Sequence, residues 1–249
     1  MMRNVFFLFC FACLAFAASL SAAGPITNRY LANRYLERCP HYSYVAKRAF
    51  VAGVLFPDIC HILPESKKEG VVFHVNASLE EVRKASSPFA AGVLFHGFIN
   101  RQRELYHEQS GLYNLLQEKA IAKPQLTLDF WEDEILFSYK DGNSWSADLQ
   151  KIYPEEQATG IDVATIKSWH RMMQSSGLFP PSTFLPIVTK LRQSFGSHTP
   201  QELSLVNTNL SRLHDDKQLI GHVAKIVHHF DLLFSEEEQR LAGQRRPRG

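Results

Sequence analysis

Apolar residues recur at helical intervals through most of the chain, and this pattern predicts an almost entirely helical protein. A broad apolar stripe over residues 41–56 predicts a helix that Pro57 ends, because proline cannot continue the hydrogen-bond ladder. Residues 59–77 lack this pattern and are expected to form a loop with a short extended piece. The segment from Ser78 to Glu81 has the form of a capping box, which predicts that a short helix begins there.

Two central helices are expected to carry polar residues inside otherwise apolar segments. In the first, His96 and Asn100 lie four residues apart and therefore share one helix face. The second is expected over residues 125–139, where Asp129 and Asp133 have the same spacing. Histidines and carboxylates are rarely buried without a partner, because burying an unpaired polar group is costly. These positions are therefore the strongest indication of a functional site.

The C-terminal part is expected to consist of further amphipathic helices. They are predicted at residues 161–173, 182–195, 200–213 and 216–234. The histidines of the last one, His222, His228 and His229, are expected on a solvated or partner-facing surface. We expect a leader at residues 1–23, a helical region at 24–145, and a C-terminal helical region at 146–249. The last region belongs either to the same domain or to a second subdomain, with residues 176–181 as the seam.

The first 23 residues have the organisation of a secretory signal peptide. Arg3 precedes an apolar run over residues 5–18, and the small residues Ser21-Ala22-Ala23 follow it. Cleavage after Ala23 would begin the mature chain at Gly24 and predicts a secreted or periplasmic protein. A retained membrane anchor is the alternative, since the run is long enough to approach a bilayer span.

Charge and cysteine content change this picture little. The chain holds 27 basic and 25 acidic side chains, and only Arg3 lies in the leader, so the mature part is close to neutral. This balance gives no electrostatic argument for binding nucleic acid or anionic lipid. Cys39 and Cys60 are the cysteines left after cleavage, and an oxidising compartment would allow them to pair. The sequence leaves this pairing and the oligomeric state open.

The polar residues of the first half are of the types that zinc prefers in hydrolytic sites, namely imidazole and carboxylate. The candidate ligands are His41, Asp58, His74, His96, Asn100, His107, Asp129 and Asp133. Helical pairs four residues apart present two ligands in one direction, and a carboxylate can bridge two metal ions. From composition and spacing alone, histidines satisfied within a core together with a helix-ending aspartate are the stronger interpretation.

The order of four segments adds a resemblance to this reading. They are His41-Tyr-Ser-Tyr-Val-Ala-Lys-Arg-Ala, Ala-Gly-Val-Leu-Phe-Pro57-Asp58, Phe73-His74 and Ala91-Gly92-Val-Leu-Phe-His96. Over about residues 36–140 the chain resembles the zinc-dependent phospholipase C family. The resemblance implies an all-α, multi-helix phospholipase C-like bundle with additional C-terminal helices and one to three zinc ions. It implies an exported phosphodiesterase in which metal-activated water attacks a phosphodiester such as a phospholipid, with peripheral membrane contact. Position by position, the resemblance also makes Asp58 the carboxylate that bridges metal ions or acts as the catalytic base.

The chain also departs from the family pattern. Asn100 stands where the family has an aspartate, and the last helical pair, Asp129 and Asp133, lacks a histidine. Gly24 replaces the amino-terminal tryptophan whose amine binds zinc in the family. Such changes favour fewer than three zinc ions. Two alternatives therefore stay open: a catalytically degenerate, non-enzymatic relative, and a zinc-dependent nuclease, which the balanced charge does not favour.

Overall fold

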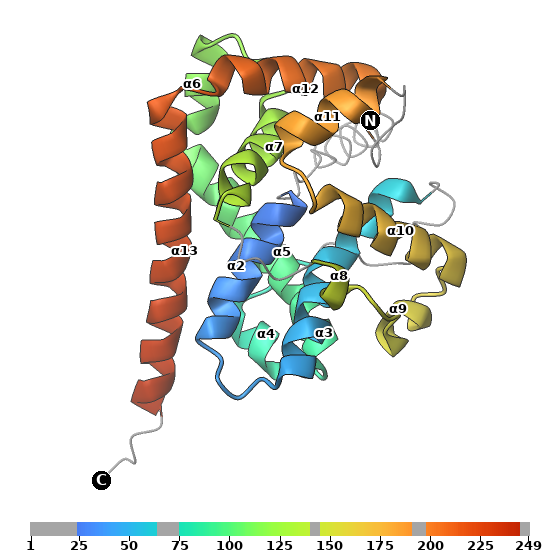
Figure 1. Cartoon of the computed structure of the whole chain (residues 1–249). Helices are drawn as coiled ribbons and strands as arrows, with labels where there is room; N and C mark the ends of the chain where they lie inside the picture. The colour runs from blue at the N-terminus through green and yellow to red at the C-terminus, as the bar shows by residue number, and fades with distance from the viewer. Residues whose placement is uncertain (1–23, 64–74, 140–144, 191–197, 245–249) are drawn as a thin grey trace, which may run out of the picture.

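The computed structural model describes residues 24–63, 75–139, 145–190 and 198–244, and over these residues the chain is all-α, as predicted (Figure 1). The helices are α2 (Pro25–Glu37), α3 (Tyr44–Leu55), the 3-10 helix η1 (Phe56–Ile62), α4 (Leu79–Lys84), α5 (Pro88–Gln109), α6 (Leu112–Glu118), α7 (Pro124–Phe137), α8 (Trp145–Asp148), α9 (Pro154–Ala158), α10 (Val163–Ser176), α11 (Pro181–Lys190), α12 (Pro200–Leu213) and α13 (Lys217–Gln244). None of the helices that the structure describes combines the length and apolar character needed to cross a bilayer.

Several elements begin where the sequence predicts. The capping box before α4 is confirmed, because Ser78 accepts from the Glu81 amide and the Glu81 carboxylate accepts from the Ser78 amide. The expected loop from residue 59 is wrong over its first residues, which continue as η1 to Ile62. Pro57 does not end the helical conformation of the chain, because proline is tolerated in the first turn of a helix and η1 begins there.

Helices α3 and α5 cross in direct backbone contact. A Cβ atom on Gly53 would lie 2.1 Å from the carbonyl oxygen of Phe89, and one on Gly92 would lie 2.1 Å from that of Phe50. Glycine is thus required at both positions, because any side chain would separate the two helices. The close crossing brings the polar face of α5 to the C-terminal end of α3, where Asp58 follows.

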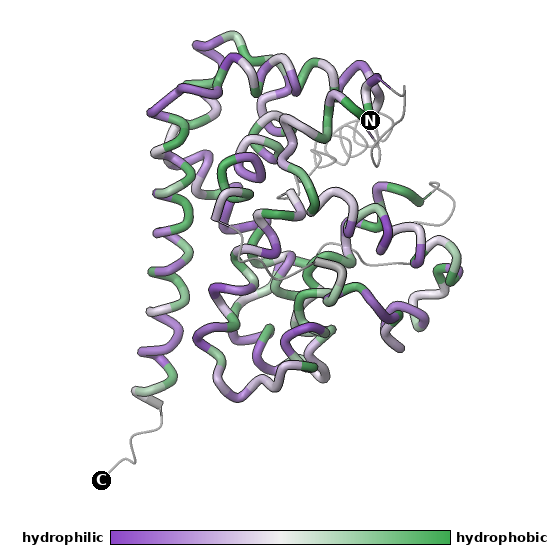
Figure 2. Tube along the Cα trace, in the orientation of Figure 1, coloured by the Kyte–Doolittle hydropathy of each residue, from purple (hydrophilic) through white to green (hydrophobic). Residues whose placement is uncertain are grey.

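The apolar core is a single cluster that draws residues from α2 through α13. Figure 2 shows hydrophobic positions concentrated along α3 and α5 and alternating with hydrophilic ones along α13. The ring of Tyr35 lies 4.7 Å from that of Phe95, and Phe95 lies 5.9 Å from Phe234, so α2, α5 and α13 meet in one aromatic contact. The C-terminal helices therefore share the core with the N-terminal region.

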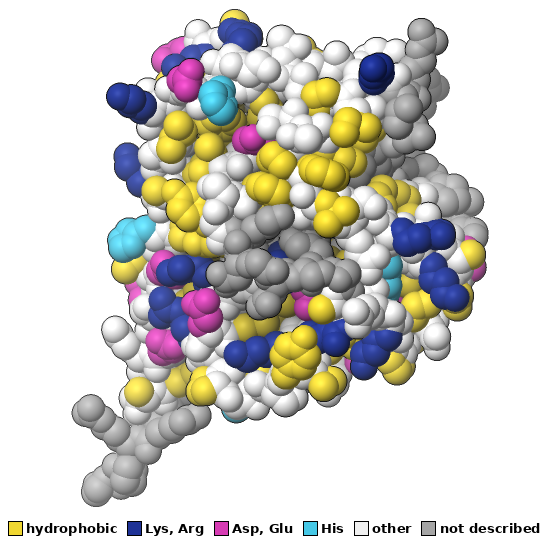
Figure 3. Space-filling view, in the orientation of Figure 1, with side chains coloured by type: hydrophobic (Ala, Val, Ile, Leu, Met, Phe, Trp, Pro, Cys, Tyr) yellow, Lys and Arg dark blue, Asp and Glu magenta, His cyan; other side chains and the backbone are white. Residues whose placement is uncertain are grey.

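Charged pairs hold the long helix α13 against α2 and α4. Arg34 donates to both carboxylate oxygens of Asp231 at 2.9 and 2.6 Å, and Arg83 lies 2.6 Å from Glu237. Figure 3 shows basic and acidic side chains intermixed on this flank, whereas hydrophobic side chains gather higher on the same face, over α7 and α11. Isolated surface pairs contribute little, but several on one seam fix the position of α13.

Candidate functional site

Four buried polar side chains follow one another along one stripe of α5. They are His96, Asn100, Arg103 and His107, and each is at most 5% exposed. Spacings of three and four residues place them on one helix face. They meet carboxylates supplied by η1 and α7, so the polar faces expected from the sequence do converge.

His96 is held in a defined orientation. Its Nδ1 lies 2.9 Å from the carbonyl oxygen of Val54, which can only accept, so Nδ1 carries the proton. Its Nε2 then faces the amide of Asn100, whose Nδ2 donates to it at 2.9 Å. The same Nε2 lies 3.6 Å from Oδ1 of Asp58. Nε2 is therefore the ring nitrogen that could bind a ligand, and the ligand would displace the Asn100 donor from it.

Asp58 is a buried carboxylate at the start of η1. Its Oδ1 has no hydrogen-bond partner within the described parts of the chain, although Nε2 of His61 lies 3.9 Å from it. Burial raises the pKa of Asp58 well above its ordinary value, and the charges of Asp129 and Asp133 raise it further. A buried, unsatisfied carboxylate oxygen beside an oriented imidazole fits a bound metal ion.

Arg103 pairs with two carboxylates of α7. Its Nε donates to Glu132 at 2.5 Å, its Nη2 donates to Asp129 at 2.6 Å, and Nε2 of His107 lies 2.7 Å from Glu132. Burial disfavours the charged forms of both Arg103 and Glu132. The adjacent carboxylates nevertheless raise the pKa of Arg103, and Arg103 and His107 lower the pKa of Glu132 to about 2. These groups form one connected network of ion pairs and hydrogen bonds between α5 and α7.

Asp133 serves a different purpose, because it receives the N-terminus of α2. Its carboxylate accepts from the amides of Ile26 and Thr27 at 3.3 and 2.7 Å, and from the Thr27 hydroxyl at 2.8 Å. Burial raises the pKa of Asp133 to about 7, against the effect of these hydrogen bonds. The carboxylate therefore acts as a cap supplied by another helix.

The structure thus brings together part of the predicted ligand set. Asp58, His96 and Asn100 are in contact, and the charges of Asp129 and Asp133 act on Asp58. Among the residues described, no group of three or more histidine, cysteine, aspartate or glutamate side chains is arranged to hold a metal ion.

Three predicted ligands remain, and the first of them, His107, pairs with Glu132 in the Arg103 network. His41 is exposed in the turn before α3, with its ring against Tyr42, and the length of α3, about 18 Å, separates it from Asp58. His74 lies outside the described residues. The described part of the site is therefore centred on Asp58 and His96.

Sequence reasoning missed Arg103, Glu132 and His61. Arg103 had a signal, since it continues the α5 stripe seven residues after His96. Glu132 adjoins Asp133, but only the packing of α7 on α5 makes it the partner of Arg103. The prediction that His222 lies on the surface is wrong. His222 is buried because α13 packs onto the end of α5, and its ring lies 5.7 Å from that of His107.

The two cysteines of the described chain are buried. Cys39 and Cys60 are not joined to each other by a disulfide in the structure. Burial raises the pKa of the Cys39 thiol, which disfavours the reactive thiolate.

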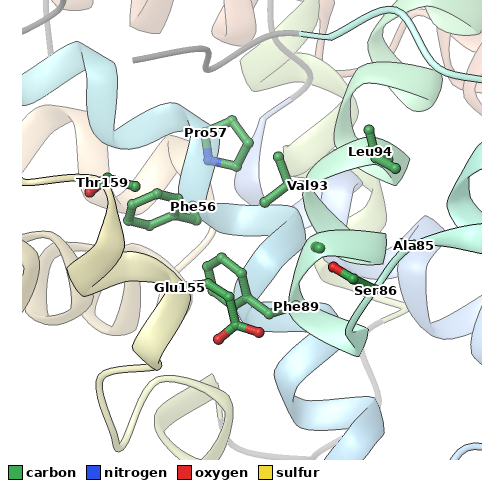
Figure 4. Close-up of a pocket in the computed structure, with 10 residues that line it drawn as sticks. Phe56, Pro57, Ala85, Ser86, Phe89, Val93, Leu94, Glu155 and Thr159 are labelled. Carbon is green, nitrogen blue, oxygen red and sulfur yellow. The ribbon is translucent and has the colours of Figure 1, made fainter. Parts of the chain in front are cut away.

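A pocket of about 350 Å³ opens on the side of η1 and the first turns of α5 (Figure 4). Its walls are mainly apolar and include Phe56, Pro57, Phe89 and Val93. Glu155 is its charged group, and it accepts a hydrogen bond from Ser87 at 2.6 Å. Pro57 is the residue directly before Asp58, so the pocket adjoins the candidate site along the chain.

Comparison with protein-family models found no match, and comparisons with curated proteins and with solved structures found no similar protein. Function therefore has to be inferred from the geometry of the site itself.

Proposed function

We propose that the protein is an exported, zinc-dependent phosphodiesterase resembling phospholipase C, with a reduced metal site centred on Asp58 and His96. The observation that carries this proposal is the buried Oδ1 of Asp58, which lacks a hydrogen-bond partner in the described structure and lies 3.6 Å from His96 Nε2. An unsatisfied buried polar group costs about 1–3 kcal/mol, and more when it is charged. A cation between these two atoms would remove that cost.

The chemistry of the donors favours zinc. Imidazole nitrogen and carboxylate oxygen suit this ion, and the bond from His96 Nδ1 to the Val54 carbonyl is the kind that orients a metal-binding histidine. The sequence adds His74 as a further ligand, and His61 lies near enough to Asp58 to join. A bound zinc would supply Lewis acidity and lower the pKa of a coordinated water. Asp58 would then hold the ion and orient that water.

The surroundings favour a single ion over three. Arg103 already pairs with Asp129 and Glu132, and Glu132 engages His107. Asp133 accepts from three donors of α2. Further dications would have to displace these protein donors from the carboxylates, so we propose one zinc.

A phospholipid is the phosphodiester that the features favour. The lining of the apolar pocket of Figure 4 includes Pro57, the residue before Asp58 in the sequence, and its walls suit a hydrocarbon part of a substrate. The nearly balanced charge of the chain does not favour a nucleic-acid backbone. Peripheral contact with a lipid surface follows from the same substrate class.

The test is the zinc content per chain of the exported protein, purified without chelator, together with hydrolysis of a chromogenic phosphodiester. We expect about one zinc in the wild type, loss of zinc in His96→Ala and Asp58→Asn, and chelator-sensitive hydrolysis. His170→Asn is the matched control, because His170 is also a buried histidine, 2.7 Å from the carboxylate of Glu156, but lies in α10. A folded protein that takes up no added zinc would overturn the proposal.

A non-enzymatic relative is the second candidate, and Arg103 is the observation that favours it. A buried guanidinium between carboxylates of α7 can replace a metal ion as the internal cation of the cluster. This alternative predicts a folded, metal-free protein whose thermal unfolding does not respond to chelator or to zinc. The zinc titration therefore separates the two candidates.

A further inference from the structure

The backbone of Gly24 lies so close to the Asp133 carboxylate that a residue with a side chain would not fit at position 24. A Cβ atom on Gly24 would lie 2.3 Å from Oδ2 and 2.5 Å from Oδ1 of Asp133, well inside van der Waals contact. Covalent geometry then places the backbone nitrogen of Gly24 within about 5 Å of Oδ2. The carboxylate of Asp133 therefore faces the position at which the predicted mature chain begins.

We propose that cleavage after Ala23 creates an α-amino group on Gly24 that pairs with the Asp133 carboxylate and so fastens α2 to α7. The inference rests on the export step of the proposed function and not on the zinc. Hydrolysis of the Ala23–Gly24 peptide bond by a leader peptidase consumes one water. It leaves a carboxylate on Ala23 and an amine on Gly24, which takes up a proton at neutral pH.

The hydrogen-bond donors that the structure gives Asp133 are neutral. It is 2% exposed and accepts from Ile26 and Thr27, while the charge of neighbouring Asp129 is met by Arg103. Within the described residues, no lysine or arginine forms an ion pair with Asp133. A buried carboxylate gains most from a partner that is itself charged. The new ammonium group supplies that charge.

The start of α2 also favours this pairing. Pro25 occupies the first turn and has no amide hydrogen, so the nitrogen of Gly24 is the next donor before Ile26. In the uncut chain this nitrogen is a neutral amide with one hydrogen, and after cleavage it is an ammonium with three. A positive charge at a helix N-terminus is unfavourable on its own because of the helix dipole. The carboxylate of Asp133 offsets this cost, so the pair is the arrangement in which the cut end is stable.

The pairing would couple processing to the candidate site. Asp133 lies in α7 beside Asp129, and both add negative potential at Asp58. The ammonium group of Gly24, paired with Asp133, would reduce that negative potential, and it exists only in the processed chain. Removal of the leader would thus reduce the net negative charge around the buried acids.

The test compares two forms of the protein, made by removing a fusion partner so that one begins at Gly24 and the other at Ala23. Thermal unfolding is measured at pH 6.5 in the presence of chelator, which takes zinc out of the comparison. We expect the Gly24 form to unfold about 2–4 °C higher. The difference should disappear in Asp133→Asn. It should persist in Asp148→Asn, which removes another buried carboxylate bound to the same helix through Arg29.

A second measurement covers the case in which Asp133→Asn does not fold. The rate at which cyanate modifies the Gly24 amine should be about tenfold lower in the folded protein than in a Gly-Pro-Ile peptide, because one unit of pKa stabilisation lowers the free-base fraction tenfold. Equal unfolding temperatures together with peptide-like reactivity would overturn the pairing. A mass spectrum showing that the exported protein does not begin at Gly24 would overturn the processing step. Zinc content, measured separately, bears only on the proposed function.

Discussion

Arg103 of α5 donates through Nε to Oε2 of Glu132 on α7 at 2.5 Å, and both side chains are 1% exposed. Removing two charges from water is expensive, and such a pair persists only when every remaining donor and acceptor is matched. Here Asp129 accepts from the other end of the guanidinium, and His107 meets the second oxygen of Glu132. The pair is therefore the centre of a complete network that joins the two helices on which the candidate site is built.

Arg103→Met should destabilise the protein strongly. The variant leaves the buried carboxylates of Glu132 and Asp129 without their cation, and breaking a buried pair in this way costs about 3–5 kcal/mol. Unfolding in urea, followed by circular dichroism, measures the loss. Arg38→Met is the control, because Arg38 is 27% exposed and pairs with Asp231 at the surface, where about 1 kcal/mol or less is expected. Similar losses in the two variants would contradict a central role for the network.

The same network predicts how stability depends on acid. The pKa of Glu132 is about 2 in the folded protein, whereas an unfolded glutamate titrates near 4.3. Its contribution is therefore fully present above about pH 4.5 and is lost as the pH falls toward 2, because the unfolded chain then binds one more proton. In Glu132→Gln, stability should start lower and fall less steeply across this interval. Parallel curves for the two proteins between pH 2 and 4.5 would show that Glu132 titrates normally.

Much of the fold could be predicted because local signals and packing agree. The capping box at Ser78 and the Thr199-Pro200 start precede helices that begin as expected, and the apolar stripes of α5 and α7 face the core. Helix α2 was not predicted, since its buried side chains include Thr27, Asn28 and Arg29. These polar side chains, buried against partners elsewhere in the chain, interrupt the apolar stripe formed by Leu31, Tyr35 and Leu36, so periodicity indicates this helix only weakly.

The site could be predicted only as far as spacing along a helix determines contact. His96 and Asn100 lie four residues apart on α5 and do interact, as expected from that spacing. The partner of His107 could not be predicted, because Glu132 reaches it only through the packing of α7 on α5. His41 shows the opposite case, since the length of α3 separates it from Asp58, which the segment order had grouped with it.

Gly92→Ala should disrupt the crossing on which the site depends. The added methyl would lie 2.1 Å from the Phe50 carbonyl oxygen, and backbone cannot move aside as a side chain can. Forcing extra volume into a packed contact costs about 1–3 kcal/mol, and more when it meets backbone. Gly221→Ala is the matched control: Gly221 also lies within a helix, but a Cβ there meets nothing within 4 Å. The thermal unfolding temperature should be lower in Gly92→Ala and slightly higher in Gly221→Ala than in the wild type. A small change in both variants would contradict the direct contact between the helices.

Asn100→Asp tests the chemistry of the site through the bond between Asn100 and His96. Asn100 Nδ2 donates to His96 Nε2 at 2.9 Å, and an aspartate has no donor to replace it. Without metal, the new carboxylate would face a ring nitrogen that also accepts, and burial would add to the cost, so the unfolding temperature should fall. With zinc, the same carboxylate becomes an additional anionic ligand. The zinc-induced rise in unfolding temperature should therefore be larger in Asn100→Asp than in the wild type.

Asn209→Asp separates this effect from the general cost of burying an acid. Asn209 is 1% exposed and donates through Nδ2 to the Ala122 carbonyl and the Thr127 hydroxyl, in α12 rather than beside His96. Its substitution should also lower the unfolding temperature, because the same donor is lost and the same charge is buried. Zinc should not restore it, since no imidazole is among these bonded partners. If zinc stabilised both variants equally, or neither, the pair formed by Asp58 and His96 would not be the metal site.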